Sequence, residues 1–145
     1  MTTTHIIMLV EDNPADVMIT QRAIRDSKLS VDLIVLRDGR EAIDYLSRQG
    51  QASEAPSRLP DLILLDVNLP GMTGREVLER IRGMPGLPPV PVVVLTTSNR
   101  QEDIEQMYRA GANSYIQKPQ EFTRFVTILR TIDAYWLRTA LLPPR

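Results

Sequence analysis

The stretch 62-LILLDVNLPGMTG-74 joins four consecutive aliphatic residues to Asp66 and then to a turn. A short apolar run between turn signals predicts a strand that is buried on both faces of a parallel sheet. Pro70 and Gly71 predict the turn, and Thr73 has a glutamate three residues later, which is the spacing of a capping box at a helix start. The stretch therefore predicts one strand–turn–helix unit with an acidic side chain at the carboxyl end of the strand.

The same alternation of strand and helix runs through the rest of the chain. Short apolar runs predict further strands at Ile6–Val10, Val31–Leu36, Val92–Leu95 and Ser114–Gln117. Helix signals follow these strands at Asn13 with Pro14, at Asp38 with Glu41, over Gln101–Ala110, and near Glu121. Polar or proline-rich stretches predict loops at Gln49–Pro60 and Gly83–Pro91. Because β–α–β crossovers are right-handed, this alternation predicts a parallel sheet covered on both faces, a three-layer α/β/α sandwich.

The composition is that of one ordinary globular domain. The 145 residues are 43% hydrophobic and 24% charged, with a formal net charge of −1, which gives no overall attraction to nucleic acid or to an anionic membrane. The absence of cysteine excludes disulfides, thiolate zinc sites and thiol nucleophiles. The first apolar run is too short for a signal peptide or a membrane span, so we expect a soluble cytoplasmic protein.

Chemically active side chains follow four of the predicted strands. Glu11 and Asp12 follow the first strand, Asp66 the third, Thr96 the fourth and Lys118 the fifth. Ligands of open parallel sheets bind beyond the carboxyl ends of the strands, so we expect these side chains to share one crevice. Acids at a helix start also cap the helix and complement its dipole, and that alternative stays open for Glu11 and Asp12.

The three acids predict a divalent metal ion. A carboxylate that directly follows four buried aliphatic residues is costly unless it is paired, and carboxylates that share a crevice repel one another. Hard oxygen ligands suit Mg²⁺, which binds through few carboxylates and keeps several of its waters. The single histidine, His5, offers no cluster that would favour zinc.

Lys118 is one of only two lysines, the other being Lys28, in a chain with 15 arginines. Lysine carries a compact ammonium where arginine carries a planar fork. A site that needs one point charge beside a phosphoryl oxygen would explain this exception, although chance would explain it as well. Asp66 could then attack phosphorus to form an acyl phosphate, with Lys118 and Thr96 stabilising the phosphoryl oxygens.

In their order along the chain, Glu11-Asp12, Asp66, Thr96 and Lys118-Pro119 resemble the receiver domain of two-component response regulators. The segment 69-LPGMTG-74 carries the same resemblance, which covers residues from about 5 to 135. It implies a flavodoxin-like sheet with the strand order 2-1-3-4-5. It also implies that Asp66 is the phosphoacceptor of a protein that assists its own phosphorylation and dephosphorylation but is otherwise not an enzyme.

The resemblance further implies how the phosphoryl group and its metal would be held. Glu11, Asp12, Asp66 and the backbone carbonyl of Asn68 would hold Mg²⁺. Lys118 would pair with the phosphoryl group, and a cis peptide bond would precede the proline that follows it, since X–Pro is where such bonds occur.

The resemblance also assigns a conformational switch to two residues and points to three positions that set the chemistry of the site. By the resemblance, Thr96 is the switch hydroxyl and Tyr115 is the aromatic side chain that turns inward after phosphorylation. Glu11 stands where the family often has Asp, which lengthens one arm of the metal site. Asn68 and Ser98 stand where receivers tune hydrolysis of the acyl phosphate.

The last predicted helix has more apolar residues than are needed to pack one of its faces on the core. Residues at helical spacing predict a face that packs on the core: Phe122, Phe125, Val126, Leu129 and Ile132. Ile128, Tyr135 and Trp136 extend the apolar surface beyond that face, as do Leu141 and Leu142. Because Tyr and Trp are enriched at interface centres, we expect a homodimer that uses this helix. The alternative is that the end of the helix folds back on its own domain.

A narrower resemblance concerns the phosphoryl donor. Tyr135-Trp136-Leu137 and the long loop at Gln49–Pro60 are similar to single-domain regulators paired with bacterial and cyanobacterial phytochrome histidine kinases. The resemblance implies that a sensor histidine kinase, such as a phytochrome, or a phosphotransfer protein supplies the phosphoryl group. We expect residues 1–145 to form one receiver domain with no DNA-binding output domain, which signals by changing its own contacts.

Three other functions fit the sequence less well. An aspartate-nucleophile phosphatase would need Asp-x-Asp after the first strand, where this chain has Glu11-Asp12-Asn13-Pro14. A scaffold that works without phosphorylation usually lacks one of the acids or the lysine. A flavin-binding domain would need a Ser/Thr/Gly-rich phosphate loop after the first strand, and the sequence has none there.

Overall fold

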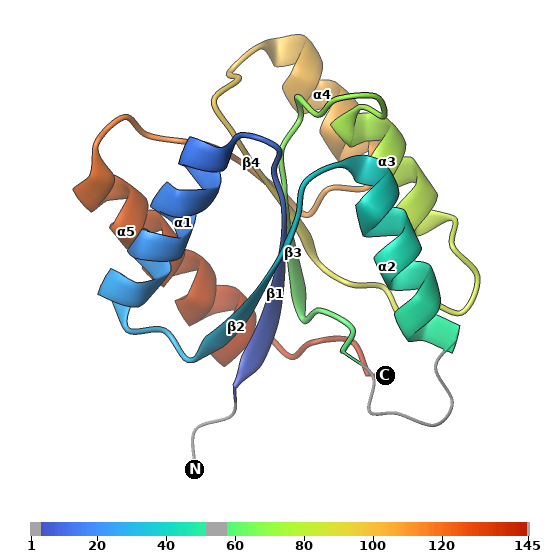
Figure 1. Cartoon of the computed structure of the whole chain (residues 1–145), viewed down its shortest axis with the longest axis horizontal. Helices are drawn as coiled ribbons and strands as arrows, with labels where there is room; N and C mark the ends of the chain where they lie inside the picture. Colours follow the sequence, from blue (N-terminus) through green and yellow to red (C-terminus); the bar gives the residue numbers. More distant parts are fainter. Residues whose placement is uncertain (1–3, 52–57, 145) are drawn as a thin grey trace.

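The computed structural model describes residues 4–51 and 58–144, which form a central parallel sheet between two layers of helices (Figure 1). The strands are β1 (His5–Val10), β2 (Val31–Leu36), β3 (Leu62–Leu65), β4 (Val92–Thr96) and β5 (Ser114–Gln117). The helices are α1 (Pro14–Ser27), α2 (Gly39–Gln51), α3 (Gly74–Arg82), α4 (Gln101–Ala110) and α5 (Phe122–Ile132). The strand order is β2-β1-β3-β4-β5, so the expected three-layer sandwich and its doubly wound topology are confirmed.

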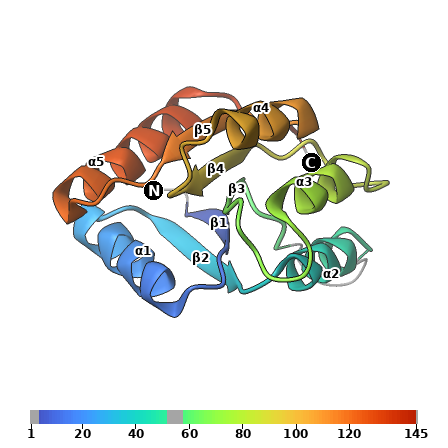
Figure 2. The same ribbon diagram turned by 90° about the horizontal axis from the view of Figure 1, so that it is seen from above.

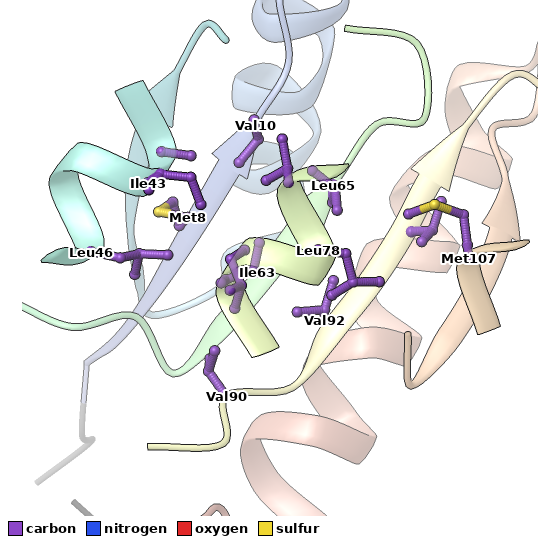
Figure 3. Packing of buried hydrophobic residues seen from close by; sticks show 14 of the residues in the cluster. Met8, Val10, Ile43, Leu46, Ile63, Leu65, Leu78, Val90, Val92 and Met107 are labelled. Carbon is purple, nitrogen blue, oxygen red and sulfur yellow. The ribbon is translucent and has the colours of Figure 1, made fainter. Parts of the chain in front are cut away.

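The strands are mostly apolar because both faces of the sheet are covered; β3 consists of four buried aliphatic residues, whereas β5 has polar residues at its two ends. In β1, Met8 and Val10 pack with α2, α3 and α4, whereas Ile7 and Leu9 pack with α1 and α5. Figure 3 shows the first of these two cores, with Ile63 of β3 beneath α3. A residue period of two therefore divides every strand between two cores, as expected for a sheet buried on both sides.

Local signals in the sequence account for the helix starts. The Asn13 side chain accepts hydrogen bonds from the backbone N–H groups of Ala15 (2.9 Å) and Asp16 (3.3 Å), and Pro14 is the first helical residue of α1. Thr73 and Glu76 form the expected capping box at α3. These caps satisfy N–H groups that have no partner within the helix and so fix where each helix begins.

The Asp38 cap at α2 is only half of the expected box. Asp38 Oδ1 accepts from the Glu41 N–H at 2.8 Å, but the Glu41 side chain accepts from the N–H of Arg37 at 3.2 Å. The expected loop at Gln49–Pro60 is also wrong at its start, because α2 continues through Gln51. Residues 52–57 of that loop lie outside the described residues.

The chain after α5 continues as a π-helical segment, η1 (Asp133–Thr139), which the sequence pattern did not predict. Three interactions join residues five apart, the spacing of a π-helix. Arg138 Nε lies 2.7 Å from Asp133 Oδ2, Thr139 Oγ1 donates to the Ala134 carbonyl, and the N–H of Ala140 donates to the Tyr135 carbonyl.

The expected cis peptide bond before Pro119 is wrong: none of the described residues has one. The trans form is the ordinary state of X–Pro bonds, favoured by about 0.5–1 kcal/mol. Within the described part of the chain, no helix combines the length and the apolar character that a membrane span requires.

Gly74 fits the start of α3 against the backbone that follows β3. A Cβ atom added there would lie 2.5 Å from the Asp66 carbonyl oxygen and 2.9 Å from Val67 Cα. We predict that Gly74→Ala lowers the free energy of unfolding by about 1–3 kcal/mol, because backbone atoms must move to admit the methyl group. Chemical denaturation measures this loss.

Gly83, at the end of the same helix, is the matched control. A Cβ atom there would meet only the Glu79 carbonyl oxygen, at 3.4 Å, and its φ is −91°. Gly83→Ala should leave stability unchanged or raise it by up to about 1 kcal/mol. Equal losses in the two variants would contradict the close approach at Gly74.

Candidate functional site

The carboxyl ends of the strands bring the expected side chains to one edge of the sheet, which Figure 2 views from above. Glu11 and Asp12 follow β1, and Asp66 follows β3, which pairs directly with β1. One carboxylate oxygen from each of these three acids lies within 4.8 Å of the others. Lys118 follows β5, and its N–H donates to the carbonyl of Thr96, the last residue of β4, at 2.7 Å.

The two oxygens of Asp66 have different surroundings. Oδ1 accepts hydrogen bonds from the hydroxyl of Thr96 at 2.7 Å and from the N–H of Asn68 at 3.2 Å. No N–H or hydroxyl of the described residues donates to Oδ2, and the ammonium of Lys118 lies 3.8 Å from it. The Glu11 side chain lies within hydrogen-bond reach of the Asp66 carboxylate. The residue is only 8% exposed. The carboxylate is thus held by one oxygen while the other remains available to react.

Lys118 is largely buried and is surrounded by carboxylates. Its ammonium donates to Glu11 Oε1, lies 3.5 Å from Asp16 Oδ2, and approaches Asp66 at the distance given above. Burial alone would lower the pKa of Lys118, but the hydrogen bond to Glu11 and the nearby negative charges outweigh burial and raise it. The ammonium is therefore charged at neutral pH and is the cation of the site.

Glu11 is the most deeply buried of the acids, at 1% exposure. Burial raises its pKa from 4.5 to about 7, the hydrogen bond from Lys118 opposes this, and the charge of Asp66 adds to it. Its Oε2 accepts from the N–H of Asn13 at 3.3 Å, so the side chain is also tied to the start of α1. Glu11 consequently exchanges a proton near neutral pH.

The donor set suits a hard divalent cation. Glu11, Asp12 and Asp66 supply carboxylate oxygens. Glu11, Asp66 and Asp16 lie within ion-pair distance of the single Lys118 ammonium. A divalent ion would offset the excess negative charge, and its preference for oxygen ligands matches this set. The fourth expected ligand, the carbonyl of Asn68, stays a prediction.

A hydrogen-bonded chain leads from Asp66 toward β5. Thr96 is fully buried, and its Oγ1 also accepts from the N–H of Ser98 at 3.4 Å. The Tyr115 hydroxyl donates to the Ser98 carbonyl at 3.0 Å, and burial raises the pKa of Tyr115. Tyr115 thus already contacts the loop after β4. The roles of Thr96 and Tyr115 as a switch stay predictions.

The expected interface residues divide between core and surface. Ile128 and Trp136 are partly buried against the core shared by α1 and α5, which favours the alternative that the helix end folds back on its own domain. Tyr135 remains 54% exposed, and its ring meets the Trp136 ring edge-on with centroids 5.0 Å apart. Leu141 is 99% exposed.

Sequence reasoning missed Asp16. It lies in the first turn of α1, four residues after Asp12, and reads as an ordinary acid that complements the helix dipole. Asp12 lies before the N-cap Asn13, outside the helix, so no helical spacing links the two acids and the sequence does not single out Asp16.

The raised pKa of Glu11 predicts that metal binding depends on pH. Because its pKa is raised to about 7, the folded protein binds a proton there below neutral pH, and a metal ion must displace it. The Mg²⁺ affinity should therefore rise about tenfold from pH 6 to pH 8, with proton release near pH 6. Calorimetry in buffers of different ionisation enthalpy measures both. In Glu11→Gln binding should be weaker and nearly independent of pH over this range; an unchanged profile would contradict the assignment.

Comparisons with known proteins agree with this geometry. The model of the response regulator receiver domain matches residues 7–130. The response regulator Rcp1 of Synechocystis sp. is 41% identical over 138 residues, which cover 95% of this chain and 92% of Rcp1.

Solved structures give the same result. The crystal structure of the phosphorylated cyanobacterial phytochrome response regulator RcpA has a TM-score of 0.85 and 43% identity, covering 98% of this chain and 100% of RcpA. The Mn²⁺-bound form of Rcp1 has a TM-score of 0.81 and 40% identity, with 97% and 99% of the two chains covered. The acidic cluster of Glu11, Asp12 and Asp66 fits the divalent metal site of a receiver. The chain belongs to the response regulator receiver domain family.

Proposed function

We propose that Asp66 accepts a phosphoryl group from a sensor histidine kinase or a phosphotransfer protein. One observation carries this proposal: no N–H, hydroxyl or ammonium of the described residues donates to Asp66 Oδ2, while Oδ1 is anchored twice. An anchored carboxylate with one unengaged oxygen is suited to nucleophilic attack.

The transfer forms one bond and breaks one. Asp66 Oδ2 attacks phosphorus, the phosphorus–nitrogen bond of the donor's phosphohistidine breaks, and its electron pair stays on the histidine nitrogen. Lys118, whose ammonium lies 3.8 Å from Oδ2, can then pair with a phosphoryl oxygen. When bound at the acids, Mg²⁺ supplies positive charge for the phosphoryl oxygens. The Thr96 hydroxyl can exchange its bond to Oδ1 for a bond to the phosphoryl group.

The loop that follows β4 would carry the change outward. Thr96 accepts from the N–H of Ser98, and the Ser98 carbonyl accepts from Tyr115, so a displacement of Thr96 alters a contact of β5. In this proposal Tyr115 reports the state of Asp66, and the protein turns over no substrate besides its own acyl phosphate.

The relatives support a particular donor and mode of signalling. Because RcpA is a phytochrome response regulator, we propose a bacterial phytochrome as the kinase. The similarity to Rcp1, of which this chain covers 92%, supports a receiver that signals through its own contacts. We place the transfer in the cytoplasm, where ATP is available to charge the kinase.

Incubation with Mg²⁺ and acetyl phosphate tests whether Asp66 accepts a phosphoryl group. We predict that intact-mass analysis finds one added phosphoryl group on the native chain and none on Asp66→Asn, which keeps the shape but loses the nucleophile. Lys118→Met should slow the reaction by at least tenfold because the only nearby ammonium is lost. An adduct on Asp66→Asn, or none on the native chain, would overturn the assignment.

A homodimer through the end of α5 is the second part of the proposal. The exposed ring of Tyr135 lies beside Trp136 and near Ile128 in sequence, and aromatic rings with exposed faces are typical of interface centres. Trp136 also packs against its own domain, so its removal would disturb the monomer. Tyr135 is therefore the better probe.

We predict that Tyr135→Ala weakens self-association by about 1–2 kcal/mol, measured by sedimentation equilibrium, because truncation removes a ring that the monomer leaves exposed. Tyr108 on α4 is 47% exposed and provides the control. Tyr108→Ala should leave association unchanged. If both variants associate like the native protein, the surface at Tyr135 is not the interface.

A further inference from the structure

Asp16 stands outside the acidic trio but contacts the same ammonium. It lies in the first turn of α1, with its side chain 32% exposed, and its Oδ2 is 3.5 Å from Lys118 Nζ. The ammonium donates to Glu11 and Asp16, while Asp66 Oδ2, at 3.8 Å, lies beyond hydrogen-bond distance. Two carboxylates thus hold the ammonium beside a third without a bond to it.

The position of the ammonium affects how readily Asp66 can react. A shift of about 1 Å would bring Lys118 to the usual length of a charge-assisted hydrogen bond with Oδ2. Such a bond would occupy the Asp66 oxygen to which no N–H, hydroxyl or ammonium of the described residues donates, and would lower its nucleophilicity. Asp16, on the helix side of the ammonium, pulls against that shift, since it is the second hydrogen-bond acceptor on the ammonium.

We propose that Asp16 is a positioning residue that holds Lys118 away from Asp66 Oδ2 in the unphosphorylated protein. This inference rests on the proposed function of Asp66. A phosphoryl group, with more negative charge than a carboxylate, then draws the ammonium from Asp16 to the new acyl phosphate. Asp16 acts through Lys118 and touches no reacting atom.

Asp16 also has an ordinary structural role, which a test must separate from this one. An acid in the first turn of a helix is favourable to the helix dipole, so its loss costs some stability. Glu102 is the matched control: it lies in the first turn of α4, is exposed, and pairs only with the exposed Arg100. Glu102→Gln removes the same charge from a helix start that lies apart from Lys118.

The two lysines make the position of the ammonium observable. In protein labelled with ¹⁵N-lysine, Lys118 and Lys28 give the only side-chain ammonium signals, and Lys28 is exposed at the far end of α1. At a fixed pH, Asp16→Asn should move the Lys118 signal and leave Lys28 in place. Phosphorylation by acetyl phosphate and Mg²⁺ should slow about two- to fivefold, the effect of losing a partly exposed ion pair. Asp16→Glu should restore most of the rate.

Each outcome either supports or overturns the role of Asp16 in positioning Lys118. A slowed Asp16→Asn with a shifted Lys118 signal, rescue by Asp16→Glu and a native-like Glu102→Gln would support it. An unchanged Lys118 signal, an unchanged rate, or equal slowing in Glu102→Gln would overturn it. Failure of the native chain to gain a phosphoryl group would instead contradict the function of Asp66, and the ammonium signal, which needs no phosphoryl donor, still decides whether Asp16 positions Lys118.

Discussion

The buried ammonium of Lys118 is the interaction on which the acidic end of the sheet depends. It contacts Glu11 and Asp16 and lies within ion-pair distance of Asp66. Two of these acids are almost wholly buried, and buried carboxylates without a cation are costly. The ammonium allows them to come together, but one positive charge does not balance them. Burial, together with the charge of Asp66, raises the pKa of Glu11. The uncompensated negative charge makes the site receptive to a divalent ion.

The scaffold places this cluster through backbone contacts as much as through side chains. The N–H of Asp66 donates to the Val10 carbonyl, so the ends of β3 and β1 are bonded directly. Gly74 lets α3 press against the backbone of Asp66 and Val67. The backbone of Asp66 is therefore fixed between a neighbouring strand and a helix start.

The sequence predicted the parts of the fold that follow from short-range pattern. Four-residue aliphatic runs gave strands such as Leu62–Leu65, and the capping residues Asn13 and Thr73 gave helix starts. It did not predict η1, because the apolar spacing of the last helix does not distinguish a π-helical turn from an α-helical one. Asp16 escaped notice for a similar reason: its partner Lys118 is 102 positions away, and only the folded sheet brings them together.

Because the chain has only two lysines, chemical immobilisation through lysine amines would attach it at a defined position. Lys118 is buried and bonded, whereas Lys28 is exposed and caps the end of α1, a helix of 14 residues whose other end adjoins the acids. That length places the Lys28 amine roughly 20 Å along the helix from the crevice. Side-chain amine coupling would thus attach the molecule through Lys28. All immobilised molecules would then have the same orientation. Their crevices would face the solution, where a binding partner can reach them.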